Sequence, residues 1–332
     1  MRKRISWVLL SMVILSSFIM NGCAQPESGN AAENVSSHKE TVLETGSGSD
    51  ILEPSQAVSE SMPAASDGTG RNLQVSDQPI YEYETQDVYA TRDGNQIYGV
   101  MYIPQHAGEQ MPAIIYSYGF GGSYRYGLQY AEAMAARGYV VYCFDFCGGS
   151  PGSRSDGSQY EMSIFTEQQD LQAVISMMQG LDYVDSENLF LLGTSQGGAV
   201  SAITAADNQD KIAGAVLLYP AFVLVDDAME RFDSIEEVPE TYQHMFMTVG
   251  RAYFEGLFDY DIYADIEGFD KDVLIIHGDA DNIVPLSYSE RAVEVYSSAE
   301  LEVIHGAGHG FSGEAAQAAI DYMTEYYHSH VH

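Results

Sequence analysis

The chain has 332 residues, 45% of them hydrophobic, which is enough for a globular domain with a large core. Its 14 Lys and Arg face 48 Asp and Glu, so the formal net charge is −34. This charge argues against a nucleic-acid partner, because binding to phosphates needs a basic face. The three cysteines are too few for a disulfide framework and no zinc or haem spacing occurs, so we expect neither a metal nor a cofactor.

The first 22 residues have the pattern of an export signal. A basic start, Met1-Arg2-Lys3-Arg4, precedes an apolar stretch over 5–20, and the pair Gly22-Cys23 resembles a bacterial lipobox. We therefore expect a signal peptide over 1–22 and lipidation of Cys23, which would hold the protein at the extracellular face of the cell membrane. A simply secreted form and an uncleaved anchor are the alternatives.

The next segment, 24–78, is rich in Ser, Glu, Gly, Ala and Asn and has no aromatic residue. Such a composition cannot bury enough apolar surface to order itself. We predict that 23–80 is a lipidated cysteine followed by a disordered linker, and that 81–332 forms one catalytic domain.

Apolar runs alternate with helical stretches through most of this domain. The alternation predicts an α/β fold with a mostly parallel eight-stranded sheet and helices on both faces. The first two strands, joined through Asp93-Gly94, are expected to form an antiparallel hairpin at the sheet edge. The predicted strands are 87–91, 96–103, 113–118, 139–146, 188–192, 212–219, 273–277 and 301–304.

Two glycine-rich loops follow the third and fourth predicted strands. The first is Tyr118-Gly119-Phe120-Gly121-Gly122, and the second covers 145–158. In the second loop we expect Asp145 to accept backbone N–H bonds and so fix the loop. We also expect its glycines to line the entrance of a pocket.

The segment Gly193-Thr194-Ser195-Gln196-Gly197 has the pattern of a nucleophile elbow, because an apolar strand enters it and a run of small residues leaves it. A strained turn between strand and helix leaves no room for side chains beside it, which explains the glycines. The turn would present the Ser195 hydroxyl, and the N–H of Gln196 would point from a helix N-terminus toward a developing oxyanion.

A serine nucleophile needs a histidine to take its proton and an acid to orient that histidine. Two downstream loops supply candidates: Asp279 and Asp281 follow one predicted strand, and His305 and His309 follow the next. The pattern alone does not exclude Asp279 and His305. We choose Asp281 and His309, because His309 lies deeper in a glycine-rich loop that can reach the serine. His277 and His305 close their strands and are expected to be packed, hydrogen-bonded structural residues.

The stretch over about 220–270 separates two predicted strands and is expected to be a lid over the site. Its acidic residues are expected to face water, and its aromatic residues to line an acyl or aryl pocket or to form a small core of the lid. The acids are Asp226, Asp227, Glu230, Asp233, Glu236, Glu237 and Glu240. The aromatic residues are Phe222, Phe232, Tyr242, Phe246, Tyr253, Phe254, Phe258, Tyr260 and Tyr263.

The elbow, the segment from His277 to Pro285 and the segment Gly306-Ala307-Gly308-His309 resemble the three triad motifs of the α/β-hydrolase superfamily. They are most similar to the branch of bacterial cinnamoyl (feruloyl) esterases and related serine esterases. In that branch the acid lies four positions after the loop histidine, which implies Asp281. The resemblance also implies the α/β-hydrolase fold and a second oxyanion donor, the N–H of Phe120. Tyr118 replaces the usual histidine of that loop.

These features predict a serine hydrolase that cleaves carboxylic esters through an acyl-enzyme on Ser195. The resemblance implies small esters as substrates, with hydroxycinnamoyl esters as one candidate. A serine peptidase of the aminopeptidase or prolyl oligopeptidase type and an acyltransferase would use the same triad. A binding lipoprotein without catalysis is the alternative from another class.

Overall fold

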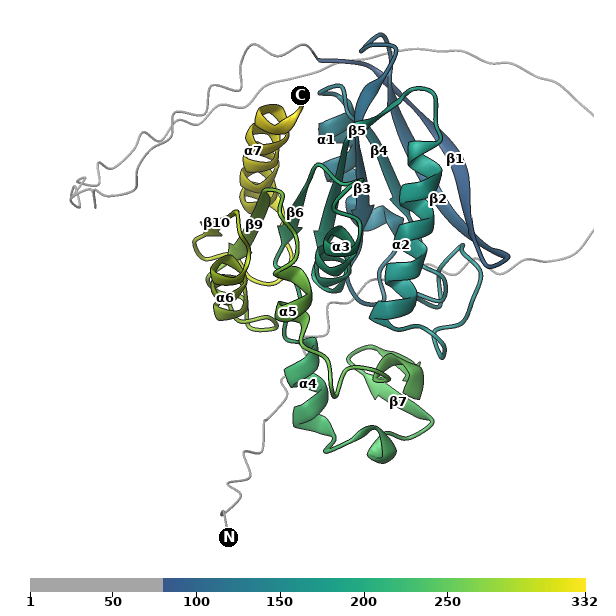
Figure 1. Ribbon diagram of the computed structural model, residues 1–332, viewed down its shortest axis with the longest axis vertical. Coiled ribbons are helices and arrows are strands. Elements are labelled where there is room, and N and C mark those ends of the chain that lie inside the picture. Colours follow the sequence, from purple (N-terminus) through teal and green to yellow (C-terminus); the bar gives the residue numbers. More distant parts are fainter. Residues whose placement is uncertain (1–79) are drawn as a thin grey trace, which may run out of the picture. The chain divides into compact units, whose positions relative to one another are not determined.

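The computed structural model describes residues 80–332, whose arrangement is drawn in Figure 1. The predicted signal peptide over 1–22, Cys23 and nearly all of the predicted linker lie outside the described residues. Within 80–332, no helix combines the length and apolar character that crossing a membrane requires.

An eight-stranded sheet has the strand order β1-β2-β4-β3-β5-β6-β9-β10. β1 and β2 form an antiparallel hairpin and β2 is antiparallel to β4, while every pairing from β4 to β10 is parallel. This topology confirms the predicted α/β-hydrolase fold class and the hairpin at the sheet edge. The strands are β1 Tyr83–Arg92, β2 Asn95–Pro104, β3 Met111–Ser117, β4 Val140–Phe144, β5 Val184–Thr194, β6 Gly214–Leu218, β9 Val273–Gly278 and β10 Ala299–Ile304.

All eight predicted strands are present. The central strands could be predicted because they are covered on both faces and are therefore continuous apolar runs in the sequence. β4, β6 and β9 are buried at every position. β1 begins at Tyr83 rather than at the predicted residue 87. It lies at the edge of the sheet, and its first half is largely exposed and lacks the apolar pattern on which the prediction rested.

Helices cover both faces of the sheet (Figure 1). α2 and α3 pack together on one face, and α1 and α7 contact each other on the opposite face. Ser163 begins α2 with a capping box, in which its side chain accepts a hydrogen bond from the Thr166 N–H and the Thr166 side chain accepts one in return. The helices of the sheet layers are α1 Leu128–Ala135, α2 Ile164–Gln179, α3 Gln196–Asp207, α6 Ser287–Val295 and α7 Gly313–His330, with a short 3-10 turn η1 at Tyr124–Gly127.

The insertion, defined here as residues 220–270, lies between β6 and β9. Figure 1 shows its α4 and β7 beyond one end of the sheet, apart from the helical layers. It contains a small antiparallel hairpin that the sequence analysis did not predict. Its elements are α4 Leu224–Arg231, η2 Ile235–Glu237, β7 Thr241–His244, β8 Met247–Gly250, η3 Arg251–Tyr253 and α5 Ile262–Ile266.

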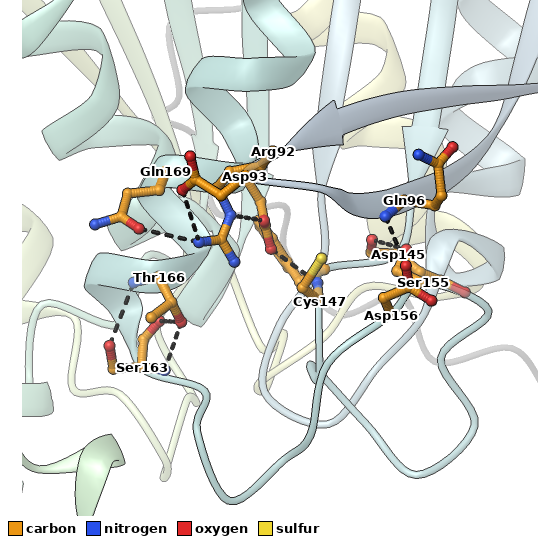
Figure 2. A network of polar contacts seen from close by, with 12 residues as sticks. Arg92, Asp93, Gln96, Asp145, Cys147, Ser155, Asp156, Ser163, Thr166 and Gln169 are labelled. Carbon is orange, nitrogen blue, oxygen red and sulfur yellow. Dashed lines mark hydrogen bonds and ion pairs between the residues drawn. The ribbon is translucent and has the colours of Figure 1, made fainter.

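Buried carboxylates fix the loop after β4, and part of the polar network around this loop is drawn in Figure 2. Asp145 accepts hydrogen bonds from the backbone N–H groups of Tyr124 at 2.8 Å and Arg154 at 2.9 Å. Asp170 of α2 accepts one from the Cys147 N–H at 2.8 Å and pairs with Arg92. The predicted structural role of Asp145 is therefore confirmed.

Candidate active site

Ser195 occupies the turn between β5 and α3 in a strained backbone conformation, with φ 51° and ψ −122°. Such a conformation is costly for a residue with a side chain and is typical of functional turns. The neighbouring backbone leaves no room for anything larger than glycine. A Cβ on Gly197 would clash with the carbonyl oxygens of Ser117 and Tyr118, and one on Gly193 would clash with the carbonyl oxygen of Gly197.

Three of the predicted residues form a continuous hydrogen-bonded chain. The Oγ of Ser195 lies 2.9 Å from Nε2 of His309, and Nδ1 of His309 lies 2.8 Å from Oδ2 of Asp281. Tyr219, just after β6, packs edge-on against the His309 ring with centroids 4.9 Å apart. The chain of bonds allows proton transfer from the serine to the histidine, with the acid holding the histidine in the required tautomer.

Asp281 is held as an anion by its surroundings. Its Oδ1 accepts hydrogen bonds from the N–H groups of Ile283 at 2.8 Å and Val284 at 2.9 Å. Burial raises the pKa of Asp281, but hydrogen bonds from His277, His309 and these two N–H groups outweigh burial and hold the pKa well below its usual range. A charged Asp281 is the state that stabilises a protonated histidine.

The competing pair, Asp279 and His305, is not part of the bond chain from Ser195 through His309 to Asp281. Its two side chains bond each other at 2.7 Å, and 86% of the His305 side chain is exposed. His305 is hydrogen-bonded as expected, but the expectation that it is packed is wrong, because it directly follows β10, the edge strand of the sheet, and has little cover. His277 is fully buried as predicted, with its ring nitrogens near Ser289 Oγ at 2.7 Å and the Val284 carbonyl at 3.0 Å.

The two predicted oxyanion donors flank Ser195. Gln196 is the first residue of α3, where backbone N–H groups have no acceptor within the helix. The loop that carries Phe120 passes directly against the serine, since a Cβ on Gly119 would lie only 2.9 Å from the Ser195 Cβ. Both N–H groups therefore belong to backbone next to the serine hydroxyl.

Tyr118 supports this loop, at the position where the resemblance implied a histidine. Its ring is buried, and its hydroxyl accepts a hydrogen bond from the Phe146 N–H at 2.9 Å. Its ring also packs edge-on against Phe146 with centroids 5.1 Å apart. The tyrosine thus ties the loop after β3 to the loop after β4.

A cavity of about 480 Å³ opens at Ser195 and His309. Eight Phe and Tyr residues contribute to its wall, and of the predicted insertion residues only Phe246, Tyr253 and the acid Asp227 belong to it. Most other aromatic residues of the insertion pack on one another or on the main domain, as in the cluster of Phe232, Tyr242 and Phe254. The other six predicted acids are exposed, as expected.

The glycines of the loop over 145–158 do not belong to the cavity wall, so their predicted role at a pocket entrance is wrong. These glycines serve close packing within the loop and against its neighbours. A Cβ on Gly148 would clash with the Ser158 backbone, and one on Gly149 would clash with the Tyr118 hydroxyl.

Two buried polar atoms of the cavity wall lack a hydrogen-bond partner among the described residues: the hydroxyl of Tyr130 and Nδ1 of His244. Burial, with a smaller effect of Arg231, lowers the pKa of His244 to about 4. His244 is therefore neutral near pH 7. A buried polar atom without a partner is costly, so a ligand group that reached either atom would be stabilised by a hydrogen bond.

The sequence analysis missed Glu167 and His244, which lie next to the site. It named Tyr253 only as an aromatic residue and missed the role of its hydroxyl. Nε2 of Gln196 donates to Oε2 of Glu167 at 2.8 Å, and the Tyr253 hydroxyl donates to Oε1 of Gln196 at 2.8 Å. One signal for Glu167 existed, since it shares the buried stripe of α2 with Ile164 and Leu171. An acid in an apolar stripe needs a polar partner.

Within residues 80–332, no group of three or more His, Cys, Asp or Glu side chains is arranged to hold a metal ion. Cys143 and Cys147 are buried free thiols.

Comparison with known proteins places this geometry in a family. The sequence pattern of the prolyl oligopeptidase family (Peptidase_S9) matches residues 124–331. The chain is 28% identical over 225 residues to an uncharacterized protein of Mycobacterium tuberculosis strain H37Rv, covering 67% of this chain and 71% of that protein.

Solved structures share the fold. Est1E from Butyrivibrio proteoclasticus, solved with ferulic acid bound, superposes with a TM-score of 0.65 at 24% identity, covering 72% of this chain and 98% of that one. The structure of DcsB in complex with its substrate analogue gives a TM-score of 0.63 at 21% identity, covering 75% of this chain and 100% of that one. The family pattern spans more than half of the chain, from η1 to just beyond α7, and the chain therefore belongs to the prolyl oligopeptidase family of α/β-hydrolases.

Proposed function

We propose that this hydrolase is a serine esterase that cleaves carboxylic esters through an acyl-enzyme on Ser195. The observation that carries the proposal is the bond chain from Ser195 Oγ through His309 to Asp281, at 2.9 and 2.8 Å, with Ser195 and His309 in the wall of a cavity that several aromatic residues line. Membership in the family supports the hydrolytic chemistry.

In this mechanism Ser195 Oγ attacks the ester carbonyl carbon while His309 Nε2 takes the hydroxyl proton. Asp281 orients and stabilises the protonated ring, and the N–H groups of Phe120 and Gln196 bind the oxyanion. His309 then gives the proton to the leaving alkoxide, and the alcohol departs. Water attacks the acyl-enzyme by the same route in reverse and releases the acid.

The cavity supports an aromatic acyl group, and we propose hydroxycinnamoyl esters as the substrate class. Its wall combines aromatic rings with two unpartnered polar atoms, Tyr130 Oη and His244 Nδ1. A flat aryl group would stack on the rings, and a ring hydroxyl would satisfy one of these atoms. The ferulic acid bound to Est1E is in keeping with such a ligand.

A peptidase is the second candidate, and Asp227 is the observation that favours it. This carboxylate belongs to the cavity wall, where it can bind the α-amino group of a peptide. Asp227 also pairs with Arg231 at 3.4 Å, which leaves less of its charge for a ligand.

A substrate panel tests the proposal: p-nitrophenyl esters, methyl ferulate and aminoacyl anilides, each with the wild type and Ser195→Ala. We expect ester turnover by the wild type and none by the variant. Cleavage of anilides alone would make the protein a peptidase. Ester turnover that survives in Ser195→Ala would refute the serine mechanism, and product analysis with added alcohols would reveal an acyltransferase.

We also propose that the protein is exported and anchored by a lipid on Cys23, which is supported by the sequence pattern over 1–23. The test is detergent phase partitioning of the full chain after expression in a bacterium that processes lipoproteins. The wild type should enter the detergent phase and Cys23→Ala the aqueous phase. Equal partitioning of the two would contradict the anchor.

A further inference from the structure

The side chain of Gln196 is held from two directions. It is 1% exposed, and both ends of its amide are bonded, Nε2 to Glu167 and Oε1 to the Tyr253 hydroxyl, each at 2.8 Å. Gln196 is also the residue whose main-chain N–H is the proposed oxyanion donor. Fixing the side chain therefore fixes the orientation of that N–H.

Tyr253 reaches this position from the insertion. It ends η3, and its ring packs edge-on against Phe120 with centroids 5.4 Å apart. One side chain of the insertion thus touches both residues that carry the proposed oxyanion donors. The backbone just before η3 is itself fixed, because a Cβ on Gly250 would clash with the Tyr160 carbonyl of the main domain.

Glu167 holds the other end from α2. Burial raises the pKa of Glu167 to about 8, with the Gln196 hydrogen bond lowering it and nearby Asp170 raising it further. Near pH 7 the side chain is therefore a neutral acid that accepts a hydrogen bond. A negative charge at this point would oppose the oxyanion, and a neutral acceptor does not.

We propose that Tyr253 and Glu167 are positioning residues that hold Gln196 so that its N–H faces the oxyanion, and that the insertion thereby completes the oxyanion hole. This rests on the proposed esterase function. The oxyanion exists only in the transition state and the tetrahedral intermediate, so the contribution must appear in kcat and not in substrate affinity.

Tyr253→Phe removes one hydroxyl and keeps the ring against Phe120. With p-nitrophenyl butyrate we expect kcat to fall by about tenfold, the factor for one lost neutral hydrogen bond, while KM stays within about twofold. Inhibition by phenylboronic acid, which forms a tetrahedral adduct on serine, should weaken by a similar factor. Tyr242→Phe is the matched control, because Tyr242 lies in the same insertion but packs on Phe232 and Phe254.

The Glu167 side is tested by two variants. Glu167→Gln keeps an oxygen that accepts from Gln196 and should retain kcat within about twofold, whereas Glu167→Ala loses the acceptor and should lower kcat by about tenfold. Melting temperatures measured for all variants identify any that fail to fold. If Glu167→Ala is unfolded, the Tyr253→Phe result decides.

An unchanged kcat in Tyr253→Phe would overturn the inference, as would a loss confined to KM or an equal loss in Tyr242→Phe. These outcomes leave the esterase proposal intact as long as Ser195→Ala is inactive. Turnover by Ser195→Ala would instead remove the esterase proposal itself.

Discussion

The loops that follow the sheet strands and the insertion between β6 and β9 contribute to the site in different ways. The strand loops carry Ser195, Asp281 and His309, which follow the ends of β5, β9 and β10. The insertion carries Tyr253, His244 and Phe246, which reach the cavity through packing of aromatic rings. The sheet thus provides the proposed chemistry, and the insertion shapes the surroundings of the reacting ester.

The difference lies in how each region is held. The central strands of the sheet are paired through backbone hydrogen bonds along their length, as in β5 with β6 and β6 with β9. The insertion has one short hairpin and is otherwise held by its own aromatic cluster and by contacts such as Tyr253 to Gln196. Substitutions in the strand loops should therefore affect turnover strongly, while substitutions in the insertion should change rates and substrate preference by smaller factors.

The largest effect is expected for Asp281→Asn. The amide keeps an oxygen for the N–H groups of Ile283 and Val284 but cannot stabilise a protonated His309. We expect kcat to fall by about 10³- to 10⁴-fold in ester hydrolysis. Asp279→Asn is the control, because Asp279 bonds the exposed His305, and it should stay within about twofold. Equal losses in the two variants would contradict the assignment of the acid.

The stability of the fold is expected to depend on pH through Glu167, near the contact of the insertion with the main domain. Glu167 in the folded protein has a pKa raised from 4.5 to about 8, so the folded state holds a proton that the unfolded state releases. Its contribution to stability is complete below about pH 4.5 and is lost as the pH rises to about 8, by up to about 1.4 kcal/mol per pH unit. Gln does not titrate, so the stability of Glu167→Gln should not fall in this way as the pH rises.

Urea unfolding of the wild type and Glu167→Gln at several pH values measures this difference. The free energy of unfolding of the variant relative to the wild type should increase between about pH 4.5 and 8 and then level off. A difference that stays constant across this range would show that Glu167 is ionised in the folded protein.

A smaller loss of stability is expected for Tyr118→Phe in the strand loops. Removing the hydroxyl leaves the buried Phe146 N–H without its acceptor, at a cost of about 1–3 kcal/mol. Tyr89→Phe is the control, since Tyr89 is half exposed at the sheet edge and should change stability by less than about 0.5 kcal/mol. Chemical denaturation measures both. Equal effects would mean that Tyr118 does not support the loop.

The smallest effect is expected for substrate preference in the insertion. If His244 Nδ1 binds a ring hydroxyl, His244→Leu should lower the preference for methyl ferulate over methyl cinnamate by about three- to tenfold. Tyr130→Phe tests the other unpartnered atom, which belongs to α1. The variant that changes the ratio of the two kcat/KM values identifies which of the two atoms binds the ring hydroxyl of ferulate. No change in either would contradict the proposed hydroxycinnamoyl substrate.

The sequence predicts the central strands β4, β6 and β9 well because they are short apolar runs with clear ends. It also predicts the residues of the bond chain, because the elbow and the two downstream loops are local patterns around Ser195, Asp281 and His309. The β7–β8 hairpin was not predicted, since each of its strands has only four residues, which is too short for an alternation of polar and apolar residues to stand out.

Contacts between segments that are far apart in the sequence could also not be predicted from local sequence patterns. Glu167 and Tyr253 lie 29 and 57 positions from Gln196, and no local spacing relates them. The exposure of His305 depends on which strand forms the sheet edge, which is a property of the topology and not of the residues around it.

The central claim is that Ser195 is a nucleophile activated by His309. Its most direct test is intact-protein mass spectrometry after treatment with a fluorophosphonate, followed by peptide mapping. We expect one adduct on Ser195 in the wild type, no adduct in Ser195→Ala and strongly slowed labelling in His309→Ala. Labelling at another residue, or none in the folded wild type, would contradict the account.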